Sequence, residues 1–195
     1  MRRSLWFLAI SLIATVATAA HVDMKDPRRA VGTDEGVRID ALLSSEFVSA
    51  RSLIGITYQI QNLSPHTIAI ADRVAEASFD SESSTMTLAV GSEVPAAGEM
   101  PRLVLIHSGE KKTLSAGAIA RWSLRARQLA RLVFVQIKVN VLRDAAPFAN
   151  VGERQKLSDE QFDQWLKVNE AITLNAIPVR YSATADRHEA DASKP

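Results

Sequence analysis

The sequence predicts an all-β protein, an antiparallel β-sandwich with one C-terminal α-helix packed at an end or edge. Three observations lead to this fold class. Residues 131–143 alternate between apolar and mostly polar positions, short segments of the same kind recur along the chain, and one amphipathic stretch with a clear helix start follows them. Strands do not alternate with long helical segments, so a parallel α/β sheet is not expected.

Residues 131–143 are expected to form the central strand. Side chains of a strand alternate between its two faces, so residues at every second position share one face. The apolar face is made of β-branched residues: Val133, Val135, Ile137, Val139 and Val141. One apolar and one largely wetted face is typical of a strand in an antiparallel sheet.

Further strands are expected at 37–42, 53–61, 67–72, 75–79, 86–90, 102–107, 111–114 and 120–126. Turn-forming residues at 62–66 and 80–83 predict two hairpins, the first joining 53–61 to 67–72 and the second joining 75–79 to 86–90. Residues 115–117 are expected to be a turn. The predicted core includes Ile56, Tyr58, Ile60, Leu88, Trp122, Val135, Ile137 and Val139.

A helix is expected over residues 158–172. Ser158 followed by Gln161 has the spacing of a capping box, and Leu157 before the cap can pack against Phe162. One helical face carries Phe162, Trp165, Leu166, Asn169 and Ile172. A final edge strand is expected at 177–181, where Pro178 is tolerated.

These elements divide the chain into five parts. They are a signal peptide at 1–20, a flexible leader at 21–36, a β-sandwich core at 37–145, the helix and final edge strand at 146–182, and a disordered tail at 183–195. The signal peptide is inferred from basic Arg2 and Arg3, an apolar run from Leu5 to Val16, and the small residues 17–20. Such a run is short for a membrane-spanning helix, so no integral span is expected after cleavage.

Composition narrows the classes of function. Removal of residues 1–20 leaves 21 basic against 22 acidic residues, without the basic excess typical of nucleic-acid binding. The chain has no cysteine, which excludes a lipoprotein and any disulfide. The expected protein is therefore exported, periplasmic or extracellular, and held together by its hydrophobic core.

Two short segments resemble parts of exported bacterial immunoglobulin-like domains. They are the strand Tyr58-x-Ile60-x-Asn62 and the turn Ser108-Gly109-Glu110. The resemblance covers about a dozen residues and implies an immunoglobulin-like arrangement of the β-sandwich.

No catalytic motif is present. The histidines have no H-E-x-x-H spacing, and neither a G-x-S-x-G elbow nor a glycine-rich phosphate loop occurs. One metal site is considered. Cleavage after Ala20 would make His21 the first residue, whose amine and imidazole are nitrogen donors suited to Cu(II), with Met24 nearby. This arrangement is similar to exported copper proteins with an immunoglobulin-like core. Cleavage after Ala19 would remove it.

Two groups of residues are candidates for binding a partner. Arg121, Arg125 and Arg127 would share one face of the strand at 120–126 and present an arginine ladder to carboxylates or anionic headgroups. The alternative is a solvated outer face. Phe162 and Trp165 could form a docking surface on the helix, or pack the helix over an open end of the sandwich.

The leading functional hypothesis is an exported, non-catalytic binding or adaptor protein of the cell envelope. It would bind another envelope protein or a surface component through a strand edge or the arginine face, and would require no cofactor. The alternative is a periplasmic copper-binding protein that uses His21.

The first testable prediction concerns processing. The basic, apolar and small-residue segments at the amino terminus should direct cleavage after Ala19 or Ala20 and release a soluble protein. Mass spectrometry of the exported protein should find a chain that begins at Ala20 or His21. Full-length chain in the membrane fraction would contradict this prediction.

Overall fold

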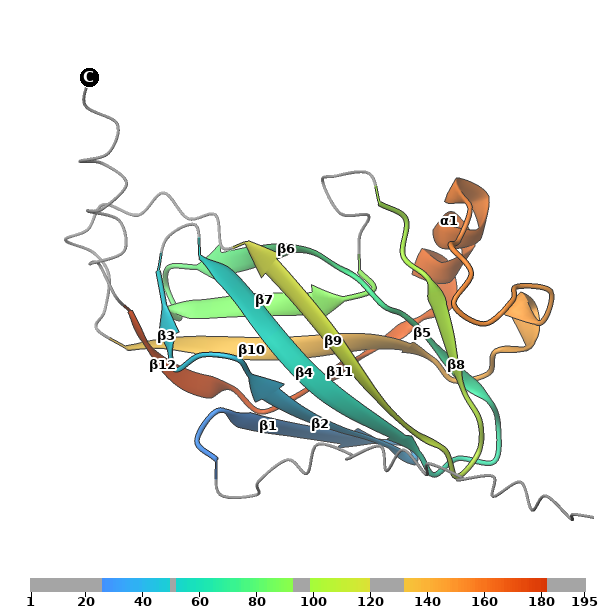
Figure 1. Ribbon diagram of the computed structural model, residues 1–195, viewed down its shortest axis with the longest axis horizontal. Helices are drawn as coiled ribbons and strands as arrows, with labels where there is room; N and C mark the ends of the chain where they lie inside the picture. The colour runs from blue at the N-terminus through green and yellow to red at the C-terminus, as the bar shows by residue number, and fades with distance from the viewer. Residues whose placement is uncertain (1–25, 50–51, 93–98, 120–131, 182–195) are drawn as a thin grey trace, which may run out of the picture.

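The computed structural model describes residues 26–49, 52–92, 99–119 and 132–181 of the chain. They fold mostly as β-strands in two packed sheets, with one α-helix (Figure 1). The first sheet is antiparallel and contains, in spatial order, β1 (Arg29–Asp34), β2 (Val37–Leu43), β4 (Leu53–Asn62) and β9 (Lys111–Ile119). The fold class is therefore all-β, as predicted.

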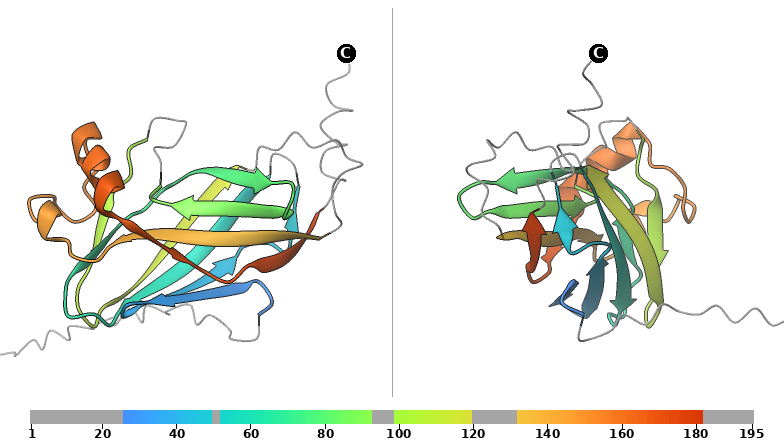
Figure 2. Two further views of the ribbon diagram at one scale, coloured as in Figure 1. Left: turned by 180° about the vertical axis from the view of Figure 1, so that it is seen from behind. Right: turned by 60° about the vertical axis from the view of Figure 1, so that its left-hand side comes forward.

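The second sheet is built on β10 (Leu132–Leu142). One edge of β10 pairs with β11 (Glu170–Thr173) and β12 (Ile177–Tyr181), and the other with β7 (Thr85–Val90) and β5 (Ile68–Ala71). From behind, β11 and β12 can be followed along β10 in orange and red (Figure 2). The outer strands are β3 (Phe47–Val48), β6 (Val74–Asp80) and β8 (Leu103–Ile106).

The prediction of β10 as a central strand is confirmed. All five of its alternate β-branched residues are fully buried, while Leu132 and Phe134 on the opposite face are exposed. The core lies between the sheets, and every predicted core residue in the described part of the chain is buried. Trp122 lies outside the described residues.

The second sheet is mixed, whereas an antiparallel fold was expected. β10 runs parallel to β7, and β12 runs parallel to β3. The predicted hairpin of β6 and β7 is confirmed. The hairpin predicted for β4 and β5 is wrong, because after Asn62 the chain crosses from the first sheet to the second. β5 is buried at all four residues, so it takes a place inside the second sheet instead of covering β4.

Two further expectations differ from the structure. β9 continues through residues 115–117, expected to be a turn, because Ile56 and Thr57 of β4 pair with Ala116 and Ser115. β1 lies within the segment 21–36 that was expected to be a flexible leader, and it pairs along its length with β2. Its small buried residues give only a weak apolar pattern, so the pairing with β2 defines this strand.

The predicted helix start is confirmed. α1 (Asp159–Val168) begins after Ser158, whose side chain accepts from the Gln161 amide while the Gln161 side chain accepts from the Ser158 amide. The helix ends earlier than the expected residue 172. Asn169 caps the helix by donating a hydrogen bond from its side-chain amide to the Trp165 carbonyl. Ile172 instead belongs to β11, where it pairs with Val139 of β10.

The strand predicted at 177–181 is present as β12, although it is not an edge along its whole length. Arg180 and Tyr181 pair with β3, whereas Pro178 lies before the part that β3 reaches. The proline therefore occupies a position where a missing backbone N–H costs no pairing with β3.

α1 lies at one end of the two sheets, beyond β5 and β8 (Figure 1). Trp165 is fully buried in a second apolar cluster. The cluster also contains Phe162, Leu157 and Phe148, the last residue of the 3-10 turn η1 (Ala146–Phe148). The indole of Trp165 donates to the Gly91 carbonyl at 2.8 Å and meets the Phe148 ring edge-on at 6.2 Å between centroids. The helix therefore closes this end of the core.

The burial of Trp165 generates a prediction about stability. Trp165→Ala should lower the free energy of unfolding by about 3–5 kcal/mol, because it leaves a cavity and removes the hydrogen bond from the indole to the Gly91 carbonyl. Leu166→Ala is the matched control. Its side chain is 43% exposed on the same helix, so the variant should lose about 1 kcal/mol or less. Denaturant unfolding measures both, and equal midpoints for the two variants would refute the packing role.

Candidate functional site

The polar candidates from the sequence lie outside the described residues. This holds for Arg121, Arg125 and Arg127 of the expected arginine face, and for His21 of the expected copper site. Across the ranges that the structure describes, no group of three or more His, Asp and Glu side chains is arranged to hold a metal ion. The arginine face and the copper site therefore stay predictions.

Phe162 and Trp165, the apolar candidates, are brought together by α1. Their side chains are buried at 2% and 0% exposure, and both pack into the cluster that closes the sheets. A partner could reach neither ring without lifting the helix from the sheets. The geometry thus supports the packing alternative for this pair.

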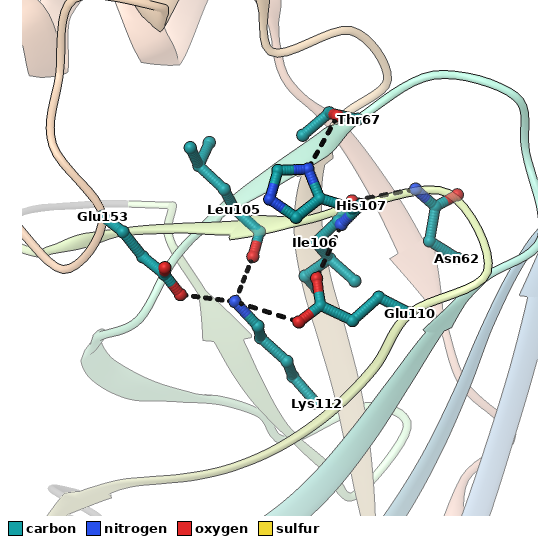
Figure 3. Close-up of polar contacts among 8 residues, drawn as sticks. All are labelled: Asn62, Thr67, Leu105, Ile106, His107, Glu110, Lys112 and Glu153. Atoms are coloured by element: carbon teal, nitrogen blue, oxygen red, sulfur yellow. Dashed lines mark hydrogen bonds and ion pairs between the residues drawn. The ribbon is translucent and has the colours of Figure 1, made fainter.

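A polar network surrounds Asn62, at the end where β4, β5, β8 and β9 meet (Figure 3). The Asn62 side chain is fully buried. Its amide donates to the carbonyls of His66 at 2.7 Å and Ile106 at 2.9 Å, and its oxygen accepts from the main chain and hydroxyl of Ser64. All its hydrogen-bonding groups are satisfied within the chain, so it holds the crossover from β4 to β5 in place.

His107 lies in this network beside a hydroxyl group. Its ring Nδ1 is 3.1 Å from the Thr67 hydroxyl, which resembles a nucleophile beside a base. A third group would have to orient the ring. The nearby Glu110 carboxylate instead accepts from the His107 main-chain N–H at 2.8 Å. The arrangement shapes the β8–β9 turn and does not favour nucleophilic catalysis.

Lys112 links the first sheet to the second across the same end. Its ammonium donates to the Leu105 carbonyl at 2.7 Å, pairs with Glu110 at 3.4 Å, and forms an ion pair with Glu153 (Figure 3). The hydrogen bond from Lys112 holds the pKa of the Glu153 carboxyl below its ordinary value. Lys112 therefore covers part of the β8 edge and is not available to an outside ligand.

The remaining candidate is the edge of β9, the last strand of the first sheet. The direction of its backbone groups follows from two contacts of β4. The Asn62 N–H donates to the Glu110 carbonyl at 3.0 Å, on the β9 side, and the Gly55 carbonyl accepts from the Ser44 N–H at 2.9 Å, on the β2 side. Since backbone direction alternates along a strand, even-numbered residues of β4 face β9 and odd-numbered ones face β2.

The register between β4 and β9 shows which backbone groups of β9 bond to β4 and which face away from the sheet. The even-numbered residues of β4 lie opposite Lys112, Leu114, Ala116 and Ala118, whose backbone groups therefore bond to β4. The odd-numbered residues of β9 direct their N–H and C=O away from the sheet. We call these five residues the open edge: Lys111, Thr113, Ser115, Gly117 and Ile119. The outward N–H and C=O groups of the open edge form no hydrogen bonds with the other described residues.

Two other edges, those of β1 and β8, are covered by specific contacts. On β1, Val31 donates to the Asn175 side chain at 2.6 Å and accepts from the Asn175 N–H at 3.1 Å. On β8, Leu103 bonds to Gln155 and Arg154, and Leu105 bonds to Lys112. β6 runs near β9 from the second sheet but does not pair with it in the described residues. Within the described residues, β9 therefore keeps outward-facing backbone groups with which another strand could pair.

The middle of the open edge carries small side chains, at Thr113, Ser115 and Gly117, and residues 113–119 carry no charge. All five residues of the open edge are exposed, and the inward-facing Leu114 and Ala116 are only partly buried. A side chain at Gly117 would come within 3.0 Å of the Ile54 carbonyl, so this position needs glycine for the close approach of β4. Residues 113–119 contain no proline, charge or bulge, the usual devices that prevent pairing at an edge.

The sequence contained a signal for this edge that the prediction did not use. Leu114, Ala116 and Ala118 alternate with Thr113, Ser115 and Gly117, which is a strand pattern of small residues. The glycine at 117 led instead to a predicted turn. A tally of alternate positions over the whole segment 111–119 would have favoured one continuous strand.

Comparison of the chain with models of known protein families, with curated proteins and with solved structures found no match. In the ranges that the structure covers, no helix has the length and apolar character needed to cross a bilayer.

The assignment of the open edge predicts that proline affects stability differently at adjacent positions of β9. Ser115→Pro removes an N–H that points away from the sheet and should change the free energy of unfolding by about 1 kcal/mol or less. Ala116→Pro removes an N–H that bonds to β4 and should cost roughly 2–4 kcal/mol. Denaturant unfolding of both variants tests this, and equal losses would mean that the alternation is assigned to the wrong residues.

Proposed function

We propose that the chain is an exported, non-catalytic binding protein that recognises an extended segment of another polypeptide by adding it as a strand to β9. The observation that carries this proposal is the open edge, with five residues whose backbone groups face outward. A strand that pairs there would satisfy these groups, which is the recognition mode known as β-augmentation. Export and the envelope location rest on the amino-terminal pattern in the sequence.

The surroundings of β9 support a binding role over a catalytic one. Among the described residues no carboxylate orients the ring of His107 beside Thr67, and Lys112 is held by Leu105, Glu110 and Glu153. Leu114 and Ala116, partly buried on the inner side of β9, offer apolar surface to alternate side chains of an added strand. An immunoglobulin-like β-sandwich is the finer architecture that we propose for this scaffold, and the two packed sheets support its coarser form.

Peptide selection tests the proposed function. The immobilised mature chain, residues 21–195, should enrich extended peptides from a random display library. Each selected peptide is then titrated against the wild type and Ser115→Pro. The proline removes the outward N–H and adds a ring at the pairing edge. Both changes should weaken peptide binding, together at least tenfold, about 1.4 kcal/mol. Glu160→Ala, on the exposed side of α1, is the control and should bind as the wild type does.

Amide chemical shifts locate the bound peptide. The largest changes should fall on residues 111–119 and should be absent in Ser115→Pro. Peptides that bind Ser115→Pro as tightly as the wild type, or that shift amides on another surface, would refute strand addition at β9.

A further inference from the structure

From the same open edge we infer a specific partner, a second copy of this chain, joined as a symmetric dimer in which two β9 strands pair antiparallel about Ser115. The inference rests on the proposed use of this edge for strand addition. With a two-fold axis at Ser115, the two residue numbers of each opposing pair add up to 230. It would join two four-stranded sheets into one continuous sheet.

The backbone fits this register. The residues with outward N–H and C=O groups are odd-numbered, and the axis at Ser115 pairs odd residues only with odd residues. Lys111 then lies opposite Ile119 of the other copy, Thr113 opposite Gly117, and Ser115 opposite Ser115. In an antiparallel ladder each such pair exchanges two hydrogen bonds, so the interface would contain about ten.

The side chains are also complementary in size. On the outer face, Thr113 lies opposite Gly117 of the other copy, where the missing side chain leaves space. On the inner face, Leu114 lies opposite Ala116, so a large partly buried residue covers a small one. Cross-strand neighbours of this kind pack without steric conflict and bury apolar surface that the single chain leaves partly exposed.

Charge selects the antiparallel arrangement over the parallel one. Both lysines of β9, Lys111 and Lys112, lie at its beginning, and residues 113–119 carry no charge. Parallel pairing in register would set the lysines of the two copies against each other, which is destabilising. The antiparallel register places them opposite Ile119 and Ala118, at the far end of the strand from their counterparts.

Engineered cysteines test the register directly, since the chain has no cysteine of its own. Two cysteines at position 115 would lie directly opposite, with Cα atoms about 5.5 Å apart, within the range of a disulfide. Two at position 113 would be four residues out of step, about 14 Å along the strand, and too far apart. Mild oxidation should therefore cross-link Ser115→Cys and leave Thr113→Cys without a cross-link. Equal cross-linking of both variants would overturn the register.

Sedimentation velocity of residues 21–195 gives the second readout. Contacts confined to strand edges belong to the smaller interfaces, so we expect a monomer–dimer equilibrium with a micromolar dissociation constant. Ser115→Pro should raise that constant at least tenfold, and a peptide that binds β9 should dissociate the dimer.

The two proposals fail in different ways. A chain that stays monomeric up to about 1 mM, well above any micromolar dissociation constant, refutes the dimer. If Ser115→Pro still abolishes peptide binding in that case, strand addition stands. A dimer that is unchanged in Ser115→Pro refutes pairing through β9.

Discussion

The fold depends on the length and burial of β10. Eleven residues at about 3.3 Å each make a strand of roughly 36 Å, long enough to take two partners end to end along each edge. β12 and β11 follow one another on one edge, and β7 and β5 on the other. Because alternate side chains of β10 are fully buried, each partner must keep a register that presents its own apolar residues to the same core.

Much of the local structure could be predicted from the sequence, since local patterns encode it. The alternation of β10, the capping box at Ser158 and the hairpin of β6 and β7 each depend on residues near one another in the chain. The partners of each strand depend on distant residues. Ile68–Ala71 has the composition of a strand, but no local feature shows that it pairs with β8 and β10 and not with β4.

The candidate site could be predicted only as a class. A strand edge was expected to bind a partner, but which edge is open depends on how the other edges are covered. Asn175, for example, covers β1 from a position 144 residues away along the chain. The helix boundary shows the same limit. Residues 169–172 continue the helical apolar face, yet Ile172 pairs with Val139 because β10 offers an open ladder there.

The bonds between Val31 and Asn175 have a consequence for the order of folding. They join β1, the first described strand, to the turn that precedes β12, the last one. The outer edge of the first sheet is therefore covered only after nearly the whole chain is available. Contacts of such sequence separation are typical of slowly folding β proteins. Until residue 175 has emerged during synthesis, β1 presents a second unpaired edge. For that interval the growing chain has a second place at which a passing strand, from a chaperone or a neighbour, can attach.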